Sequence, residues 1–336
     1  MRTARAIPLL VLLLALGAFV KNPYAVSGFP LDDGWIHRVY SRSFAYGHGF
    51  CYNDGVQEAG STSPLWAIVT APAHWLEPLG TRAVVVAVKL VGILCALATV
   101  VAAGILAAEV SGSAIGGMVG AALLALEPRL LFSALSGMET SLLLALWASA
   151  SAAAARGRHW LAAVLFGLML VSRPEAAVLL PFVLPSLLQV HRRRGARAAA
   201  GATFLALAPA LLWAVFCLHT TGHPLPNTYY VKARVVLPGM QQLELAWRSV
   251  FLHGLAPPVA FLIVAAGCTA ARLRGGGLRA ISVMPLLLPG AGAVAYLLAV
   301  VGSRPIDLQG YYWTRWLDPA SIMFSLLFCV GCASLV

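Results

Sequence analysis

Residues 31–66 read LDDGWIHRVYSRSFAYGHGFCYNDGVQEAGSTSPLW, a polar segment rich in glycine and aromatic residues that lies between long apolar runs. The segment carries four of the 12 acidic residues of the chain. Asp32 and Asp33 follow the first apolar run closely, so if that run spans a membrane both carboxylates lie at the membrane surface. Ionisable residues at such a position are usually functional. We therefore interpret this segment as the functional part of the chain and the apolar runs as its scaffold.

The composition predicts an all-α, polytopic integral membrane protein. Hydrophobic residues make up 60% of the chain, charged residues make up 10%, and the mean hydropathy is +0.84. A soluble globular protein has about 25% charged residues, which excludes that class. The strands of a membrane β-barrel are alternating segments of about ten residues, whereas these apolar runs are long and rich in leucine and alanine. A barrel is therefore excluded as well.

The basic residues indicate the orientation of the chain in the membrane. The formal net charge is +11, which in a soluble protein would suggest a nucleic-acid partner. Here the arginines cluster in short turns at 156–159, 191–197 and 272–279. Short basic turns are typical of the cytoplasmic face of a membrane protein. We therefore expect membrane lipids, and no nucleic acid, as the surroundings of this chain.

The apolar runs predict about ten transmembrane helices in one domain, residues 1–336. Ile7–Val20 fits either a signal peptide or a first transmembrane helix; because no convincing cleavage site follows, we interpret it as a retained helix with a cytoplasmic N-terminus. Leu65–Leu76 is too short to span and is expected to be interfacial or re-entrant. The other predicted spans are 82–108, 113–126, 129–155, 160–171, 176–190, 198–218, 258–271, 281–301 and 316–336.

Alternating sides along these spans leaves most acidic residues on one face. The three basic turns fall inside, and of the acidic residues only Glu109 does. The external loops are then 21–65, which we expect to hold an interfacial helix, 219–257 and 302–315. Proline and glycine interrupt several spans near the outer side, and irregular backbone at membrane depth is tolerated where it lines a cavity. We predict a cell (inner) membrane protein whose active face is periplasmic or extracellular.

The aspartate pair has two interpretations from the residues alone. Asp32 and Asp33 suit the N-terminus of a short surface helix, where a carboxylate accepts hydrogen bonds from free backbone N–H groups. One of them also suits a general base, because a carboxylate near cations stays ionised until it takes a proton. If the helix forms, Asp33 and His37 share a face, and so do Arg38 and Arg42. Two adjacent aspartates permit a hard divalent cation, Mg²⁺ or Ca²⁺, without requiring one.

The predicted outer loops also gather cations and aromatic residues. Arginine and lysine are the residues that hold a phosphate or pyrophosphate in an interfacial cavity. The alternative is that they contact lipid headgroups or pair with Glu127, Glu175 and Asp318. Most of the aromatic residues are expected to form an interfacial belt, and some suit stacking on a sugar. The cations are Arg129, Arg173, Lys232, Arg234, Arg304 and Arg315.

Short motifs spread over most of the chain resemble the GT-C superfamily of polyprenyl-phosphate-sugar-dependent membrane glycosyltransferases, in particular its bacterial arabinosyl- and mannosyltransferase-like members. Each motif is weak alone, but their order along the chain is specific for the superfamily. They are Asp32-Asp33, GHGFCYN at 47–53, GSTSPLW at 60–66, SGMET at 136–140, RPE at 173–175 and PLPNTYYVK at 224–232.

The resemblance implies inverting transfer of a sugar from a polyprenyl-phosphate-linked donor to an acceptor hydroxyl on a cell-envelope glycan, lipid or protein. It implies that an aspartate of the first external loop is the catalytic base; we favour Asp33, with Asp32 orienting the acceptor or a metal. The lipid phosphate leaves as an anion and needs cationic stabilisation. Glu139 suits substrate contact and helix capping equally. The candidates for binding the substrate and its phosphate are Arg173, Lys232, Arg304, Arg315, His37, Glu139 and Tyr229.

Two other functions stay open at this point: a transporter or lipid flippase, and a non-catalytic subunit of an envelope-assembly complex. A transporter is expected to carry ionisable residues deep within its spans, and Lys89 is the one clear mid-span charge. Members of the superfamily usually continue with further helices and often a soluble external domain. This sequence ends at Val336 within an apolar run, as expected of a fragment or a minimal form.

Overall fold

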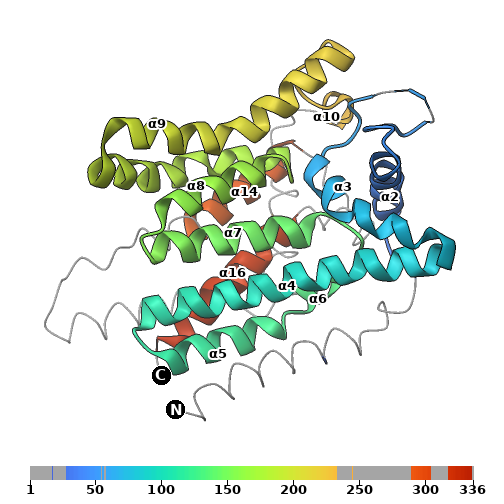
Figure 1. Ribbon diagram of the computed structural model, residues 1–336. Coiled ribbons are helices and arrows are strands. Elements are labelled where there is room, and N and C mark those ends of the chain that lie inside the picture. Colours follow the sequence, from blue (N-terminus) through green and yellow to red (C-terminus); the bar gives the residue numbers. More distant parts are fainter. Residues whose placement is uncertain are drawn as a thin grey trace, which may run out of the picture.

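The structure is a computed structural model that describes residues 17, 28–53, 55–56, 58–232, 244, 289–303 and 317–334. Every element within these residues is a helix, as Figure 1 shows. The elements are α2 (Asp32–Ala45), α3 (Pro64–Thr70), the 3₁₀ helix η2 (Ala71–Leu79), α4 (Thr81–Ser111), α5 (Ala114–Ala125), α6 (Pro128–Leu135), α7 (Thr140–Ala155), α8 (His159–Leu170), the 3₁₀ helix η3 (Pro174–Leu179), α9 (Leu180–Thr221), α10 (Asn227–Lys232), α14 (Gly290–Ser303) and α16 (Asp318–Ala333).

Several of these helices are apolar enough for a membrane. Within the described residues, α4 and the continuous stretch η3–α9 are long and apolar enough to cross one, and α5 with α6 forms a third candidate that is bent by 62°. The shorter helices α7, α8, α14 and α16 are also apolar. The predicted number of about ten spans stays a prediction, because nearly all of 7–20 and all of 258–271 lie outside the described residues.

The core of the molecule is built on α4, which packs against α5, α6, α7 and α16. Figure 1 shows α4, α5, α7 and α16 running side by side. Small residues allow close approach between membrane helices. On α4, Gly104 lies against Gly117 of α5, where a β-carbon would come 3.0 Å from the Gly117 carbonyl oxygen. Trp147 of α7 is fully buried in the same core.

The continuous stretch η3–α9 contains the two spans predicted at 176–190 and 198–218, and α9 is interrupted between them at a single residue. Gly195 has φ 83° and ψ 178°, a conformation essentially restricted to glycine, and it breaks the helix in two. Figure 1 shows α9 doubling back on itself, and both halves pack against α8. His159 at the start of α8 lies 3.4 Å from Ser186 of the first half, and the Trp160 ring lies against Gly201 of the second.

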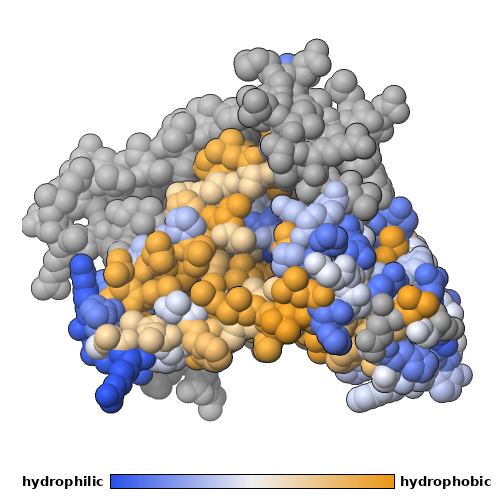
Figure 2. Space-filling model, turned by 90° about the horizontal axis from the view of Figure 1, so that it is seen from above, coloured by the Kyte–Doolittle hydropathy of each residue, from blue (hydrophilic) through white to orange (hydrophobic). Residues whose placement is uncertain are grey.

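Two of the predicted basic turns, at 156–159 and 191–197, lie at the same end of the helices, and the third, at 272–279, lies outside the described residues. A β-carbon on Gly157 would lie 3.2 Å from Nη1 of Arg193, and the Nε of Arg156 donates to Glu109 at 2.8 Å. In Figure 2 a hydrophilic surface lies at each end of the molecule with an apolar surface between them. The left end corresponds to the turn of α9 in Figure 1, and the right end corresponds to α2. This distribution of polarity fits a protein embedded in lipid by its middle.

The expected helix of the first loop is α2, which packs on α3 and η2 at the end opposite the basic turns. Asp32 and Asp33 lie in its first turn and Arg42 lies in its last, as the helix dipole favours. The capping interpretation of the aspartates is wrong in detail: the N-cap residue is Leu31, and no side chain caps the helix.

Two long-range hydrogen bonds fix this first-loop region to the helical core. The Nζ of Lys89, in α4, donates to the Gly28 carbonyl at 3.1 Å just before α2. The Nε1 of Trp66, in α3, donates to the Gly137 carbonyl at 2.9 Å. The mid-span charge of Lys89 therefore serves to hold the segment that leads into α2.

Candidate active site

A cavity of about 80 Å³ lies between α2, the 60–62 segment, the turn from α6 to α7, and the start of η3. Together with Thr228 of α10, which also lines the cavity, segments from five separate parts of the sequence therefore meet at one place. We call it the Asp33 cavity. The acidic and basic residues that line it are Asp33, His37, Glu139, Arg173 and Glu175. Four of them are predicted site residues, brought together from α2 and two later turns.

Local structure explains how each side chain reaches the cavity. Asp33 and His37 are one helical turn apart in α2 and line the same cavity, as the sequence predicts. Glu139 is the N-cap residue of α7, but its side chain accepts no capping hydrogen bond. Arg173 is extended, with φ −152° and ψ 129°, because Pro174 follows it at the start of η3.

Glu139 joins two of the predicted residues in a buried network. Its Oε2 lies 2.8 Å from Nε2 of His37, and its Oε1 lies 2.8 Å from Nε of Arg173. The Nη1 of Arg173 donates to the hydroxyl oxygen of Tyr296, in α14, at 3.2 Å. The side chains of Glu139 and Arg173 are each 3% exposed. The capping alternative for Glu139 is therefore replaced by ion pairing.

The electrostatics of the network keep Glu139 ionised. Burial opposes ionisation, but the nearby Arg173 and His37 outweigh it and hold the pKa of Glu139 below its usual value. The pKa of Arg173 is raised: burial opposes its charge, and Tyr296 and Glu139 outweigh burial. The site therefore contains a fixed guanidinium whose own counter-charge is provided by the protein.

The two aspartates of the pair do not play equivalent parts. Asp33 is half-buried and lines the cavity, whereas Asp32 is exposed and accepts the backbone N–H of Asp33 at 2.8 Å. Consecutive residues of a helix do not face each other. The pair therefore does not fit a site in which both carboxylates bind one divalent cation. Within the described residues, no three side chains of histidine, cysteine, aspartate or glutamate gather as metal ligands.

Tyr229 lies beside the Asp33 cavity rather than on its wall. Thr228, its neighbour in α10, lines the cavity and donates through its hydroxyl to the Gly60 carbonyl at 2.8 Å. The backbone N–H of Asn227 donates to the Ala59 carbonyl at 3.0 Å. The segment after α9 is thus fastened to the 59–60 segment.

The remaining predicted cations fall into two groups. Lys232 ends α10, and its side chain lies outside the described residues, as do Arg234, Arg304 and Arg315. Arg129 is buried 3.5 Å from Asp318 of α16, which is the pairing given above as the alternative to phosphate binding.

Sequence reasoning missed Tyr296, which contacts Arg173. A signal for it is present, because Tyr296 is a hydroxyl-bearing residue in the middle of the otherwise apolar run AGAVAYLLAVV at 291–301. A buried tyrosine usually needs a hydrogen-bond partner. That partner is Arg173, which is far away in the sequence.

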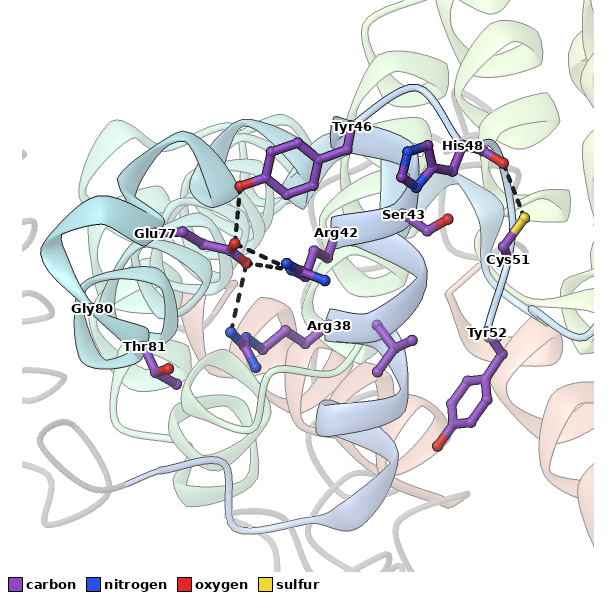
Figure 3. Close-up of a pocket in the computed structure, with 11 residues that line it drawn as sticks. Arg38, Arg42, Ser43, Tyr46, His48, Cys51, Tyr52, Glu77, Gly80 and Thr81 are labelled. Atoms are coloured by element: carbon purple, nitrogen blue, oxygen red, sulfur yellow. Dashed lines mark hydrogen bonds and ion pairs between the residues drawn. The ribbon is translucent and has the colours of Figure 1, made fainter. Parts of the chain in front are cut away.

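A second, larger cavity of about 840 Å³ lies on another face of α2 (Figure 3). Arg38 and Arg42 line it from α2, Tyr46 lines it from just after the end of that helix, and Glu77 lines it from η2. We call it the Arg38 cavity. Arg38 and Arg42 share this face, as predicted, and both contact Glu77.

Glu77, which directly follows the apolar run predicted at 65–76, contacts several side chains of this second region. It accepts hydrogen bonds from Nε of Arg42 at 2.9 Å, from the Tyr46 hydroxyl at 2.9 Å and from Nδ1 of buried His74 at 2.8 Å. Partial burial opposes ionisation, but the hydrogen bonds from His74, Tyr46 and Arg42 outweigh it and lower the pKa of Glu77 to about 2.

The comparisons with known proteins identify the fold. No protein-family model matches the sequence, and no curated protein sequence matches it. The structure is similar to two crystal structures of ArnT from Cupriavidus metallidurans. The undecaprenyl phosphate complex has a TM-score of 0.64 and 17% sequence identity, and the apo structure has a TM-score of 0.63 and 18% identity.

The similarity extends over nearly the whole chain but only part of ArnT. It covers 97% of this chain and 59% of ArnT in the complex, and 98% and 60% in the apo structure. ArnT is a GT-C glycosyltransferase that depends on polyprenyl phosphate. The prediction of an all-α, polytopic membrane fold is confirmed, and this chain shares its fold with the matched part of ArnT.

Proposed function

We propose that this chain transfers a sugar from a polyprenyl-phosphate-linked donor to an acceptor hydroxyl, with inversion at the anomeric carbon. The observation that carries the proposal is the Asp33 cavity, which places a carboxylate and the fixed guanidinium of Arg173 around one enclosed space. The undecaprenyl phosphate bound in ArnT supports a lipid-linked donor. The acceptor is a cell-envelope glycan, lipid or protein.

In the proposed reaction, the Asp33 carboxylate takes the proton of the acceptor hydroxyl as the acceptor oxygen bonds to the anomeric carbon. The bond from that carbon to the phosphate oxygen breaks on the opposite side, and its electron pair leaves with the lipid phosphate. Arg173 stabilises the departing anion, since a prepositioned cation acts where charge develops. His37 and Glu139 hold Arg173 in place rather than exchange protons with the substrate.

The size of the Asp33 cavity bears on how substrate enters. Ligand sites for small molecules usually measure about 300–1,000 Å³, whereas this cavity measures about 80 Å³. We infer that the cavity holds only the reacting groups, and that the rest of the donor lies outside it, with its polyprenyl chain in lipid.

The orientation forms part of the proposal. The Asp33 cavity lies at the α2 end of the molecule, and the basic turns at 156–158 and 191–197 lie at the opposite end. Basic turns favour the cytoplasmic side. We therefore propose a multi-pass protein of the cell (inner) membrane, with a cytoplasmic N-terminus and the Asp33 cavity on the periplasmic or extracellular face.

The decisive test is to replace Asp33 and Asp32 separately by asparagine and to measure transfer from a radiolabelled polyprenyl-phosphate sugar in membranes. Loss of a general base costs about 10²–10⁴-fold in rate. We expect that loss in Asp33→Asn and a smaller effect in Asp32→Asn, with equal amounts of protein in the membrane. Full activity in both variants contradicts the mechanism.

A further inference from the structure

The Arg38 cavity has the size and the lining of a polar ligand site. Its volume of about 840 Å³ lies within the range of small-molecule sites, about 300–1,000 Å³. Figure 3 shows Arg38 and Arg42 of α2, and Tyr46 just beyond its end, directed towards Glu77. Ser43 and Thr81 add hydroxyl groups, and Tyr52 adds a second phenol ring.

The charges of this lining favour an anion. Among the described lining residues, Arg38 and Arg42 carry positive charge and Glu77 carries the one negative charge. The low pKa of Glu77 keeps its carboxylate ionised at neutral pH. That single negative charge neutralises only one of the two guanidinium groups. One positive charge is therefore left over for a ligand.

Geometry assigns that charge to Arg38. The Nε of Arg42 contacts Glu77 through both carboxylate oxygens, at 2.9 and 3.2 Å. The Nη2 of Arg38 lies 3.7 Å from Glu77, beyond hydrogen-bond distance, and its side chain is 22% exposed. The Arg38 guanidinium also lies 6.0 Å from the centre of the Trp35 ring. Arg38 is thus positioned at the cavity while making only long contacts with these two side chains.

We propose that the Arg38 cavity binds the phosphate group of an anionic sugar, with Arg38 contacting the phosphate and the tyrosine rings and hydroxyl groups contacting the sugar. Arginine binds phosphate through two parallel N–H donors, and aromatic rings suit the faces of sugars. The cavity is separate from the Asp33 cavity, because the residues of α2 that line the two cavities lie on different faces of the helix.

The role of that ligand rests on the proposed function. Because the proposed function places the donor phosphate beside Arg173 in the Asp33 cavity, on one face of α2, a phosphorylated sugar on the other face is assigned as part of the acceptor. The same phosphate chemistry is present in the headgroup of an anionic lipid, so the test compares the two sources.

The test uses the full chain in nanodiscs of phosphatidylcholine, with glucose 1-phosphate as the probe and glucose as the neutral control, by isothermal titration calorimetry. We expect Arg38→Gln to weaken glucose 1-phosphate binding about tenfold or more, the effect of losing a hydrogen bond to a charged group. Glu77 keeps Arg42, Tyr46 and His74 as donors in this variant, so the fold is expected to persist.

The matched control is Arg158→Gln, which removes the same charge from an exposed arginine at the opposite end of the molecule. It should bind as the wild type does. Equal weakening in both variants, or none in Arg38→Gln, overturns the proposal.

In a second experiment, the nanodiscs contain phosphatidylglycerol. If this lipid displaces glucose 1-phosphate from the wild type, the source is a lipid headgroup; if it does not, the source is a soluble or acceptor-borne phosphate. Either result supports the site, provided that the binding of glucose 1-phosphate is weakened in Arg38→Gln.

Asp33→Asn separates this inference from the proposed function. We expect this variant to lose sugar transfer while it keeps the Arg38-dependent binding of glucose 1-phosphate. If the wild type shows that binding but transfers no sugar, the site stands and the proposed function fails. If sugar transfer depends on Asp33 while glucose 1-phosphate binding is unchanged in Arg38→Gln, the site fails and the proposed function stands.

Discussion

The Nε of Arg173 lies 2.8 Å from Oε1 of Glu139, and the two side chains are each only 3% exposed. This buried ion pair joins the turn before α7 to the turn before η3. Removing charges from water is costly, and the attraction between them offsets that cost only while both partners are present. Loss of either residue therefore leaves the other as an unpaired buried charge, which destabilises the site.

Replacing one residue of this pair by an apolar residue should destabilise the protein more than replacing both. Glu139→Leu leaves the Arg173 guanidinium buried without its main counter-charge, which costs about 3–5 kcal/mol. The double variant Glu139→Leu with Arg173→Met should recover much of that loss, because no buried charge stays unpaired. Thermal unfolding in detergent compares the single and double variants. Strictly additive losses of stability would show that the two residues are not coupled.

Tyr296→Phe should lower transfer without unfolding the protein. It removes the hydroxyl oxygen that accepts from Nη1 of Arg173, whereas the ring keeps its place 5.7 Å from the ring of Trp147. A hydrogen bond to a charged group contributes about 1.5–3 kcal/mol, so we expect at least about a tenfold fall in kcat with little change in KM.

The control for this prediction is Tyr230→Phe, because Tyr230 is an exposed tyrosine of α10. It should leave kcat unchanged. A normal kcat in Tyr296→Phe would mean that Arg173 holds its position without the phenol. A change confined to KM would place the effect on ground-state binding instead.

Gly34→Ala should move α2 away from the site. A β-carbon at Gly34 would lie 2.7 Å from the Ser136 carbonyl oxygen and 3.1 Å from Cβ of Phe29, closer than backbone and side chain allow. Because Asp33 and His37 belong to the same helix, we expect both lower thermal stability and weaker transfer. Gly290→Ala is the control, since its β-carbon would make an ordinary contact of 3.5 Å with Leu327. Wild-type behaviour in Gly34→Ala would contradict the close packing of α2.

Stability should depend on acid through Glu77. Its folded-state pKa is about 2, below the ordinary value of 4.5, so its ionised form stabilises the fold above pH 4.5. That stabilisation is lost as the pH falls from 4.5 towards 2. The unfolding temperature of the wild type should exceed that of Glu77→Gln at pH 6, and the difference should shrink below pH 4.5. A difference that stays constant down to pH 3 would exclude Glu77 as the group responsible.

The helical spacing of the first loop was predictable, but the partners of its side chains were not. Local periodicity places Asp33 with His37 on one face of α2 and Arg38 with Arg42 on another, and both pairings hold in the structure. Helical spacing says nothing about which distant residue meets each face. Glu139 reaches His37 through the packing of the core on α4, and that packing is a property of the whole fold.

The misinterpretations have physical causes too. Capping was one of the two interpretations of Asp32 and Asp33 because aspartate is a strong capping residue, yet the N-cap residue is Leu31 and both aspartates lie in the first turn. Glu77 looked like a simple end to an apolar run because the residues that give it a function, Arg38 and Arg42, belong to a different element. Tyr296 became significant only once the fold placed it against Arg173.

Gly195 has a consequence for how much membrane the chain can cross. An unbroken α9 would be a rod of roughly 63 Å for its 42 residues, about twice the ~30 Å hydrocarbon thickness of a bilayer. The reversal at one glycine divides that overlong rod into two shorter segments, 180–194 and 196–221, which meet at an arginine-rich tip. A substitution that straightened residue 195 would therefore create a mismatch with the lipid that tilting alone could not absorb.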